Sequence, residues 1–80
     1  MLLTVDIGNS HITLGVFNGE ELCFTARMAT DTKRTQDLYA VDINGIMDLY
    51  KAQKEQITGS IICSVVPEIT DSIARAIKKS

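Results

Sequence analysis

A short apolar segment that carries one carboxylate and runs into a glycine turn constrains this chain more than any other feature. Leu2 to Ile7 is mostly apolar apart from Thr4 and Asp6, and Gly8-Asn9-Ser10 follows at once. A short apolar run bounded by turn residues is typical of a buried β-strand. The sequence therefore predicts a strand whose carboxyl end presents Asp6 beside a polar turn.

This turn contains the groups that a magnesium nucleotide requires. Asp6 could hold Mg²⁺ through its water shell, because the ion prefers one or two carboxylates and keeps several waters. Gly8 lets the backbone approach phosphate oxygens and can adopt positive φ, and successive N–H groups form an anion-binding concavity. Asn9 and Ser10 add side-chain donors. The alternative is an ordinary β-turn, since the same residue types are common in turns.

Composition narrows the class of protein. Eighty residues, 45% of them hydrophobic and 22% charged, predict one small globular domain. The net charge of −2 gives no support for nucleic-acid binding, which requires a basic patch. No apolar run approaches the roughly 18 residues of a membrane span, and the first acid comes too early for a signal peptide. We expect a cytoplasmic protein in which Cys23 and Cys63 are buried free thiols.

Apolar periodicity and turn signals predict the element order βββαβα. Alternation from His11 to Phe17 predicts a second strand, and Asn18-Gly19 is a hairpin signal in which both residues tolerate positive φ. The chain returns through a third strand over Leu22–Ala26. These three strands are expected to form an antiparallel meander.

The sequence after the third strand predicts a helix, a strand and a second helix. The first helix is expected over Leu38–Tyr50, with Thr35 as N-cap and Asp37 in its first turn. Its expected buried side comprises Leu38, Tyr39, Ile43, Ile46, Leu49 and Tyr50. The run Ile61–Val66 predicts a central parallel strand covered on both faces. Pro67 can begin the last helix, whose apolar stripe is Ile69, Ile73, Ala76 and Ile77.

Four segments of the chain share their order and spacing with one known family. They are Asp6-Ile7-Gly8-Asn9-Ser10 with Gly15, Arg27-Met28 with Thr30-Asp31, Thr35-Gln36-Asp37-Leu38-Tyr39, and Ser64-Val65-Val66-Pro67. Together they resemble the amino-terminal part of a type III pantothenate kinase over nearly the whole chain. Leu38 is a departure, because an acidic residue is common at that position in the family.

The resemblance implies an α/β fold of the acetate and sugar kinase, Hsp70 and actin superfamily, in which two ribonuclease-H-like halves enclose an ATP cleft. We expect residues 1–80 to form the amino-terminal part of a single half-domain. The implied activity is ATP-dependent phosphorylation of pantothenate to 4'-phosphopantothenate, the first step of coenzyme A biosynthesis. The resemblance also implies a homodimer that needs Mg²⁺ or another divalent cation and a monovalent cation such as K⁺. The alternative is a nucleotide-binding regulatory or scaffold module of the same superfamily.

The resemblance also implies roles for single residues. Asp6 matches the metal-linked carboxylate, and Gly8, Asn9 and Ser10 match the phosphate-facing turn. The expected nucleotide-binding residues are Asp6, Ile7, Gly8, Asn9, Ser10 and His11. For His11, a place on a strand surface is the alternative. Arg27, Thr35, Asp37 and Tyr39 match family positions without an assigned role, and for Arg27 either an anion contact or a salt bridge is open.

The resemblance implies that the chain is a truncated half-domain. The glycine-aspartate-arginine segment that should supply the catalytic base, and a second aspartate-glycine-threonine phosphate motif, do not occur before Ser80. We therefore expect no catalytic residue and no turnover from these 80 residues alone. A further strand of the related fold would pair beside Ile61–Val66. Without it the strand has an unpaired apolar edge, so we expect the isolated chain to be marginally stable or oligomeric.

Overall fold

The computed structural model describes residues 1–79, apart from the side chains of Lys54 and Lys79, and has the predicted element order. The elements are β1 (Leu2–Ile7), β2 (His11–Asn18), β3 (Glu21–Ala29), α1 (Gln36–Leu49), the 3₁₀ helix η1 (Lys54–Gln56), β4 (Gly59–Ser64) and α2 (Pro67–Lys79). The sheet order is β3-β2-β1-β4, with β1–β3 antiparallel and β4 parallel to β1. The predicted α/β class and the meander are confirmed, and the arrangement is consistent with the expected ribonuclease-H-like half-domain.

The hairpin between β2 and β3 differs in detail from its prediction. Asn18 is the last residue of β2 and pairs with Glu21, so the loop consists of Gly19 and Glu20. Only Gly19 in this loop has positive φ, at 64°. The expected positive φ at Asn18 is therefore wrong, because the pairing of the two strands extends one residue further than the sequence signal suggested.

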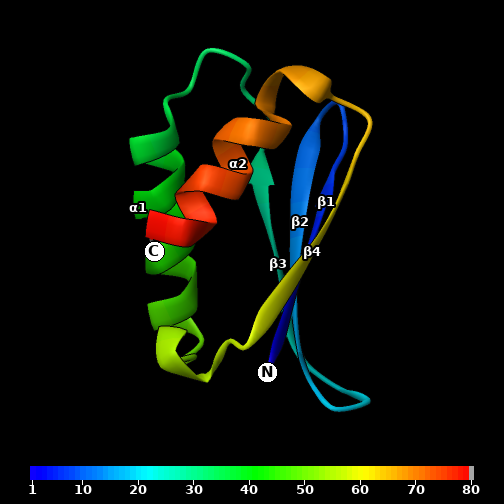
Figure 1. Cartoon of the computed structure of the whole chain (residues 1–80), viewed down its shortest axis with the longest axis vertical. Coiled ribbons are helices and arrows are strands. Elements are labelled where there is room, and N and C mark those ends of the chain that lie inside the picture. Colours follow the sequence, from blue (N-terminus) through cyan, green and yellow to red (C-terminus); the bar gives the residue numbers. More distant parts are fainter. Residues whose placement is uncertain (80) are drawn as a thin grey trace.

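Both helices lie on the same side of the sheet (Figure 1), so the protein has two layers and one core. The strand residues that face the helices alternate along β1 and β2 and are fully buried. The core comprises Leu3, Val5, Ile7, Ile12, Leu14, Val16 and Met28 from the sheet, Tyr39, Ala40, Ile43 and Met47 from α1, and Val66, Ile69, Ile73 and Ala76 from α2 and its approach. No described element covers the opposite face of the sheet.

The two helices test the predicted apolar faces. In α2 the predicted stripe is confirmed, since Ile69 and Ile73 are fully buried. In α1 the predicted N-cap Thr35 is confirmed by its hydroxyl, which accepts the Leu38 N–H at 3.3 Å. The expected burial of Leu38, Leu49 and Tyr50 is wrong, because they are 46%, 73% and 46% exposed. The helix is rotated so that Tyr39, Ile43 and Met47, spaced four residues apart, are buried in the core, where α1 packs against α2.

For strand β4, the predicted cover on both faces is wrong, whereas the unpaired edge expected in the absence of a further strand is present. The strand is an edge of the four-stranded sheet, and Ile61 is 53% exposed. Cys63 is also exposed, because it pairs with Asp6 on the face that no described helix covers. Cys23 is exposed on the opposite edge strand. Both cysteines are free, as expected, but their predicted burial is wrong.

The start of the chain is bound to the segment that leads into β4. The Met1 ammonium donates to the Gln56 carbonyl at 2.6 Å, and the Met1 carbonyl accepts the Thr58 N–H at 2.8 Å. These bonds join residues more than 50 positions apart and fix the register of β4 on β1. Within residues 1–79, no helix is long and apolar enough to cross a membrane.

Candidate functional site

Asp6 lies near the carboxyl end of β1, on the face of the sheet that the helices leave open. Its neighbours across the strands are Thr13 on β2 and Cys63 on β4. The side chain is exposed and makes no ion pair or hydrogen bond with any of residues 1–79. The carboxylate is therefore available to a ligand from solvent.

The turn Gly8-Asn9-Ser10 follows β1 and is held by hydrogen bonds to β2 and to Thr30. The Gly8 N–H donates to the His11 carbonyl at 2.9 Å, which closes the β1–β2 connection. The Gly8 carbonyl accepts the Thr30 hydroxyl at 2.7 Å, and the Ser10 carbonyl accepts the Thr30 N–H at 3.0 Å. Two backbone acceptors of the turn are thus satisfied by one residue from the end of β3.

The other two backbone donors of the turn, those of Asn9 and Ser10, are free by contrast. The N–H groups of Asn9 and Ser10 donate to no other residue that the structure describes, and both residues are exposed. Consecutive free N–H groups in a turn suit an anion. With the Asp6 carboxylate three positions before Asn9, this donor set fits a phosphate accompanied by a hydrated Mg²⁺. No group of three or more His, Cys, Asp or Glu side chains within the described chain could hold a metal by itself, so such an ion would depend on phosphate oxygens as well.

The structure accounts for glycine at position 8 by the limited room beside its Cα, and not by a left-handed backbone conformation. Its φ is not positive, and a Cβ built on it would lie 3.2 Å from the His11 carbonyl oxygen. Gly15 of the same resemblance segment lies in the middle of β2, opposite Thr4, and not in the turn. A Cβ there would lie only 2.7 Å from the Thr4 Oγ1. Gly15 therefore serves packing on the open face of the sheet.

Two expected nucleotide-binding residues have distinct environments. The Ile7 side chain is fully buried in the core, and its carbonyl accepts the Val65 N–H at 3.1 Å. Its side chain faces away from the exposed groups of the turn. His11 is exposed at the first position of β2, on the same face as Thr13 and Asp6, so the strand-surface place is confirmed and a phosphate contact stays a prediction.

Arg27 adds a positive charge to the same face. It pairs with Thr13, which in turn pairs with Asp6, so the three residues form a row across β3, β2 and β1. Arg27 is exposed and makes no ion pair with a described residue. Of the two alternatives left open by the sequence, the structure shows no salt bridge.

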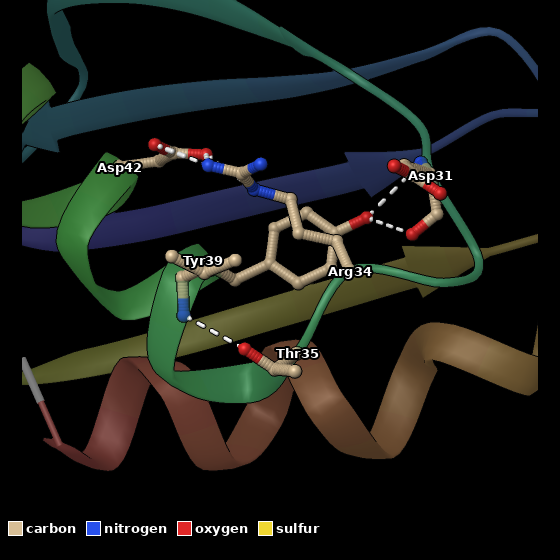
Figure 2. Close-up of polar contacts among 6 residues, drawn as sticks. Asp31, Arg34, Thr35, Tyr39 and Asp42 are labelled. Atoms are coloured by element: carbon tan, nitrogen blue, oxygen red, sulfur yellow. Dashed lines mark hydrogen bonds and ion pairs between the residues drawn. The ribbon is translucent and has the colours of Figure 1, made fainter.

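Residues 30–35 join the sheet to α1 and are fixed through Tyr39, which is fully buried. The Tyr39 hydroxyl donates to the Asp31 carbonyl at 2.7 Å and accepts the Asp31 N–H at 3.1 Å. Figure 2 shows this hydroxyl pointing from α1 toward Asp31. The loop that carries Thr30 is thereby anchored to the core.

A second contact braces the same loop. Arg34 binds Asp42 of α1 through two nitrogens, with Nε to Oδ2 at 2.9 Å and the terminal nitrogen to Oδ1 at 3.0 Å (Figure 2). The guanidinium carbon lies 5.9 Å from the centre of the Tyr39 ring. Such two-point contacts set geometry more strictly than a single ion pair.

Comparison with known proteins decides the family. The family model described as type III pantothenate kinase matches residues 2–80. The chain belongs to this family. It is 39% identical over 79 residues to the type III pantothenate kinase of Finegoldia magna, covering 99% of this chain and 30% of that protein. The corresponding protein of Geobacter sulfurreducens is 43% identical over 75 residues, covering 94% and 29%, and that of Streptomyces avermitilis is 37% identical over 83 residues, covering 99% and 31%.

The chain thus spans about 30% of the length of the curated relatives that it matches. The matched part contains the open sheet face with Asp6 and the turn with its free donors. It also contains three contacts that the sequence did not predict, namely Thr30 with the turn, Tyr39 with Asp31, and Arg34 with Asp42. The Thr30 contact joins positions 22 residues apart, and no local sequence signal could have indicated it.

Proposed function

We propose that the full-length protein of this type III pantothenate kinase transfers the γ-phosphoryl group of ATP to the primary hydroxyl of pantothenate, giving 4'-phosphopantothenate. The matched relatives are named as type III pantothenate kinases. One observation supports extending this activity to this chain. The family match covers the β1–β2 turn, where the free N–H groups of Asn9 and Ser10 follow the free carboxylate of Asp6.

Phosphoryl transfer depends mainly on positioning and charge neutralisation. In the proposed arrangement, Asp6 orients the water shell of Mg²⁺, and the N–H groups of Asn9 and Ser10 bind phosphate oxygens. Mg²⁺, when bound, neutralises charge on the phosphates. Arg27 supplies a further positive charge on the same face of the sheet. We assign no catalytic base within residues 1–79.

We extend this proposal, on the family resemblance alone, to a cytoplasmic homodimer that also requires a monovalent cation such as K⁺. Activity measured in matched potassium and sodium salts, with sedimentation of the full-length protein, would test both parts. Equal rates in the two salts, or a stable monomer, would contradict the corresponding part.

A titration with MgATP tests the nucleotide site directly. We expect the 80-residue chain to bind MgATP and the Asp6→Asn variant to bind it more weakly, since the variant loses the carboxylate that the ion requires. Asp48→Asn is the matched control, because Asp48 is an exposed carboxylate of α1 and the change in net charge is the same. Equal binding by all three proteins, or none by any, would contradict the assigned role of Asp6.

The reaction itself is tested with the full-length protein. We expect ADP release that depends on pantothenate and that Asp6→Asn lowers while Asp48→Asn does not. Binding of MgATP without pantothenate-dependent ADP release would instead support a nucleotide-binding regulatory or scaffold module, the alternative function.

A further inference from the structure

Among the residues that the structure describes, Thr30 is the one outside β1 and β2 that forms hydrogen bonds with the candidate phosphate turn, Gly8-Asn9-Ser10. It follows β3 directly, and it donates its hydroxyl to the Gly8 carbonyl at 2.7 Å and its N–H to the Ser10 carbonyl at 3.0 Å. These two acceptors stand on either side of Asn9. Thr30 therefore binds the turn at both ends and leaves its middle untouched.

The planarity of the peptide unit makes this contact directional. In a trans peptide the carbonyl and the following N–H point in opposite directions. Because the Gly8 carbonyl is turned toward Thr30, the Asn9 N–H of the same peptide unit points away from it. The contact at the Ser10 carbonyl holds the other end of the turn, so the peptide unit that carries the Ser10 N–H lies between two held carbonyls. Thr30 thus orients the Asn9 N–H through its own peptide plane and restrains the Ser10 N–H from both sides, without using either donor.

Thr30 is itself held in place through its neighbour Asp31, which is bound to a residue of the core. Both backbone groups of Asp31, the next residue, are bound to the hydroxyl of the fully buried Tyr39 (Figure 2). A connection thus runs from the core, through Asp31 and Thr30, to the carbonyls of the turn. A rigid support of this kind lowers the cost of ordering a binding site when its ligand arrives.

We propose that Thr30 is a positioning residue for the phosphate groups of a nucleoside triphosphate. Its hydroxyl holds the Gly8 carbonyl so that the N–H groups of Asn9 and Ser10 keep one orientation toward the anion. This role rests on the proposed nucleotide site at the same turn. Thr30 itself does not touch the ligand.

Substitutions at Thr30 test the role. Thr30→Val keeps the branched shape and removes the hydroxyl, and Thr30→Ser keeps the hydroxyl. Thr58→Val is the matched control, because the Thr58 hydroxyl also donates to a backbone carbonyl, that of Met1 at 3.2 Å, at the opposite end of β1. We expect Thr30→Val to bind MgATP about five- to tenfold more weakly, as for one lost hydrogen bond. Thr30→Ser and Thr58→Val should remain within about twofold of the parent chain.

A second measurement reads the turn without any ligand. In ¹H–¹⁵N NMR spectra of the free chain, Thr30→Val should shift the Asn9 and Ser10 amide signals, and Thr30→Ser should restore them. Thr30→Ala replaces Thr30→Val in both measurements if the valine variant is unfolded by circular dichroism. Unchanged amide signals would overturn the positioning role whether or not the chain binds nucleotide. Full MgATP affinity in Thr30→Val, with loss in Asp6→Asn, would overturn the role of Thr30 and leave the proposed function standing.

Discussion

The Tyr39 hydroxyl offers the most direct test of how the loop before α1 is held. Tyr39→Phe removes one oxygen atom and keeps the ring, which is fully buried between α1 and the sheet. The change deletes two hydrogen bonds, at 2.7 and 3.1 Å, and leaves the carbonyl and N–H of Asp31 without this partner. The packing of the core should be unaffected, so any loss of stability reports on the two bonds.

The expected size follows from the environment of Asp31. A hydrogen bond contributes about 0.5–1.5 kcal/mol net, so two would contribute about 1–3 kcal/mol. Asp31 is exposed, and water can replace part of what the hydroxyl supplied. We therefore expect a loss of about 1–2 kcal/mol in the free energy of unfolding. For a domain of this length the same loss lowers Tm by about 4–16 °C.

Urea denaturation followed by circular dichroism at one protein concentration measures the effect. Tyr50→Phe is the control, because Tyr50 is 46% exposed, its ring stacks on Phe24 with centres 4.4 Å apart, and its hydroxyl has no bonded partner among residues 1–79. The control should stay within about 0.5 kcal/mol of the parent chain. Equal stability of the two variants would refute the view that Tyr39 anchors the loop.

Three other substitutions test separate features of the structure. Gly15→Ala should destabilise the chain by about 1–3 kcal/mol, because the new Cβ would lie 2.7 Å from the Thr4 Oγ1, and the cost measured by urea denaturation should shrink when Thr4→Ala is already present. Gly45→Ala should stabilise it by about 0.5–1 kcal/mol, since Gly45 is inside α1 with nothing within 4 Å of the new atom; a lower Tm would contradict this. Ile61→Lys places a charge on the exposed edge strand β4 and should reduce self-association, measured by sedimentation over a concentration series. A parent chain that is monomeric at every concentration would contradict the expectation that this edge pairs with other chains.

Local patterns in the sequence were sufficient to predict the order of the elements. The stripe of Ile69 and Ile73 predicted the buried face of α2, and Thr35 was found as the N-cap of α1. The rotation of α1 was less predictable, because Leu38 and Leu49 are as apolar as the residues that are buried. A spacing of four residues from Tyr39 to Ile43 to Met47 marked the correct face. The apolar run of β4 gave no indication that its outer face is open in this part of the protein.

The candidate site could be predicted only in part, for a reason that concerns distance along the chain. Asp6 and the turn lie in one continuous segment, so their nearness is evident from sequence. The hydroxyl of Thr30 reaches Gly8 across 22 positions, and the row from Asp6 to Arg27 exists only through strand register. Neither relation leaves a local signature in the residues involved.

The parallel pairing of β1 with β4 has a consequence for the growing chain on the ribosome. The meander β1–β3 can form as soon as its residues emerge, and hairpins form within about 1–10 μs. The second neighbour of β1 arrives only after residues 8–58 have been synthesised, which takes roughly 3–10 s at ~5–20 residues per second. For those seconds the strand that carries Asp6 has one open side. The nascent protein is therefore most exposed to mispairing at the strand on which its proposed site is built.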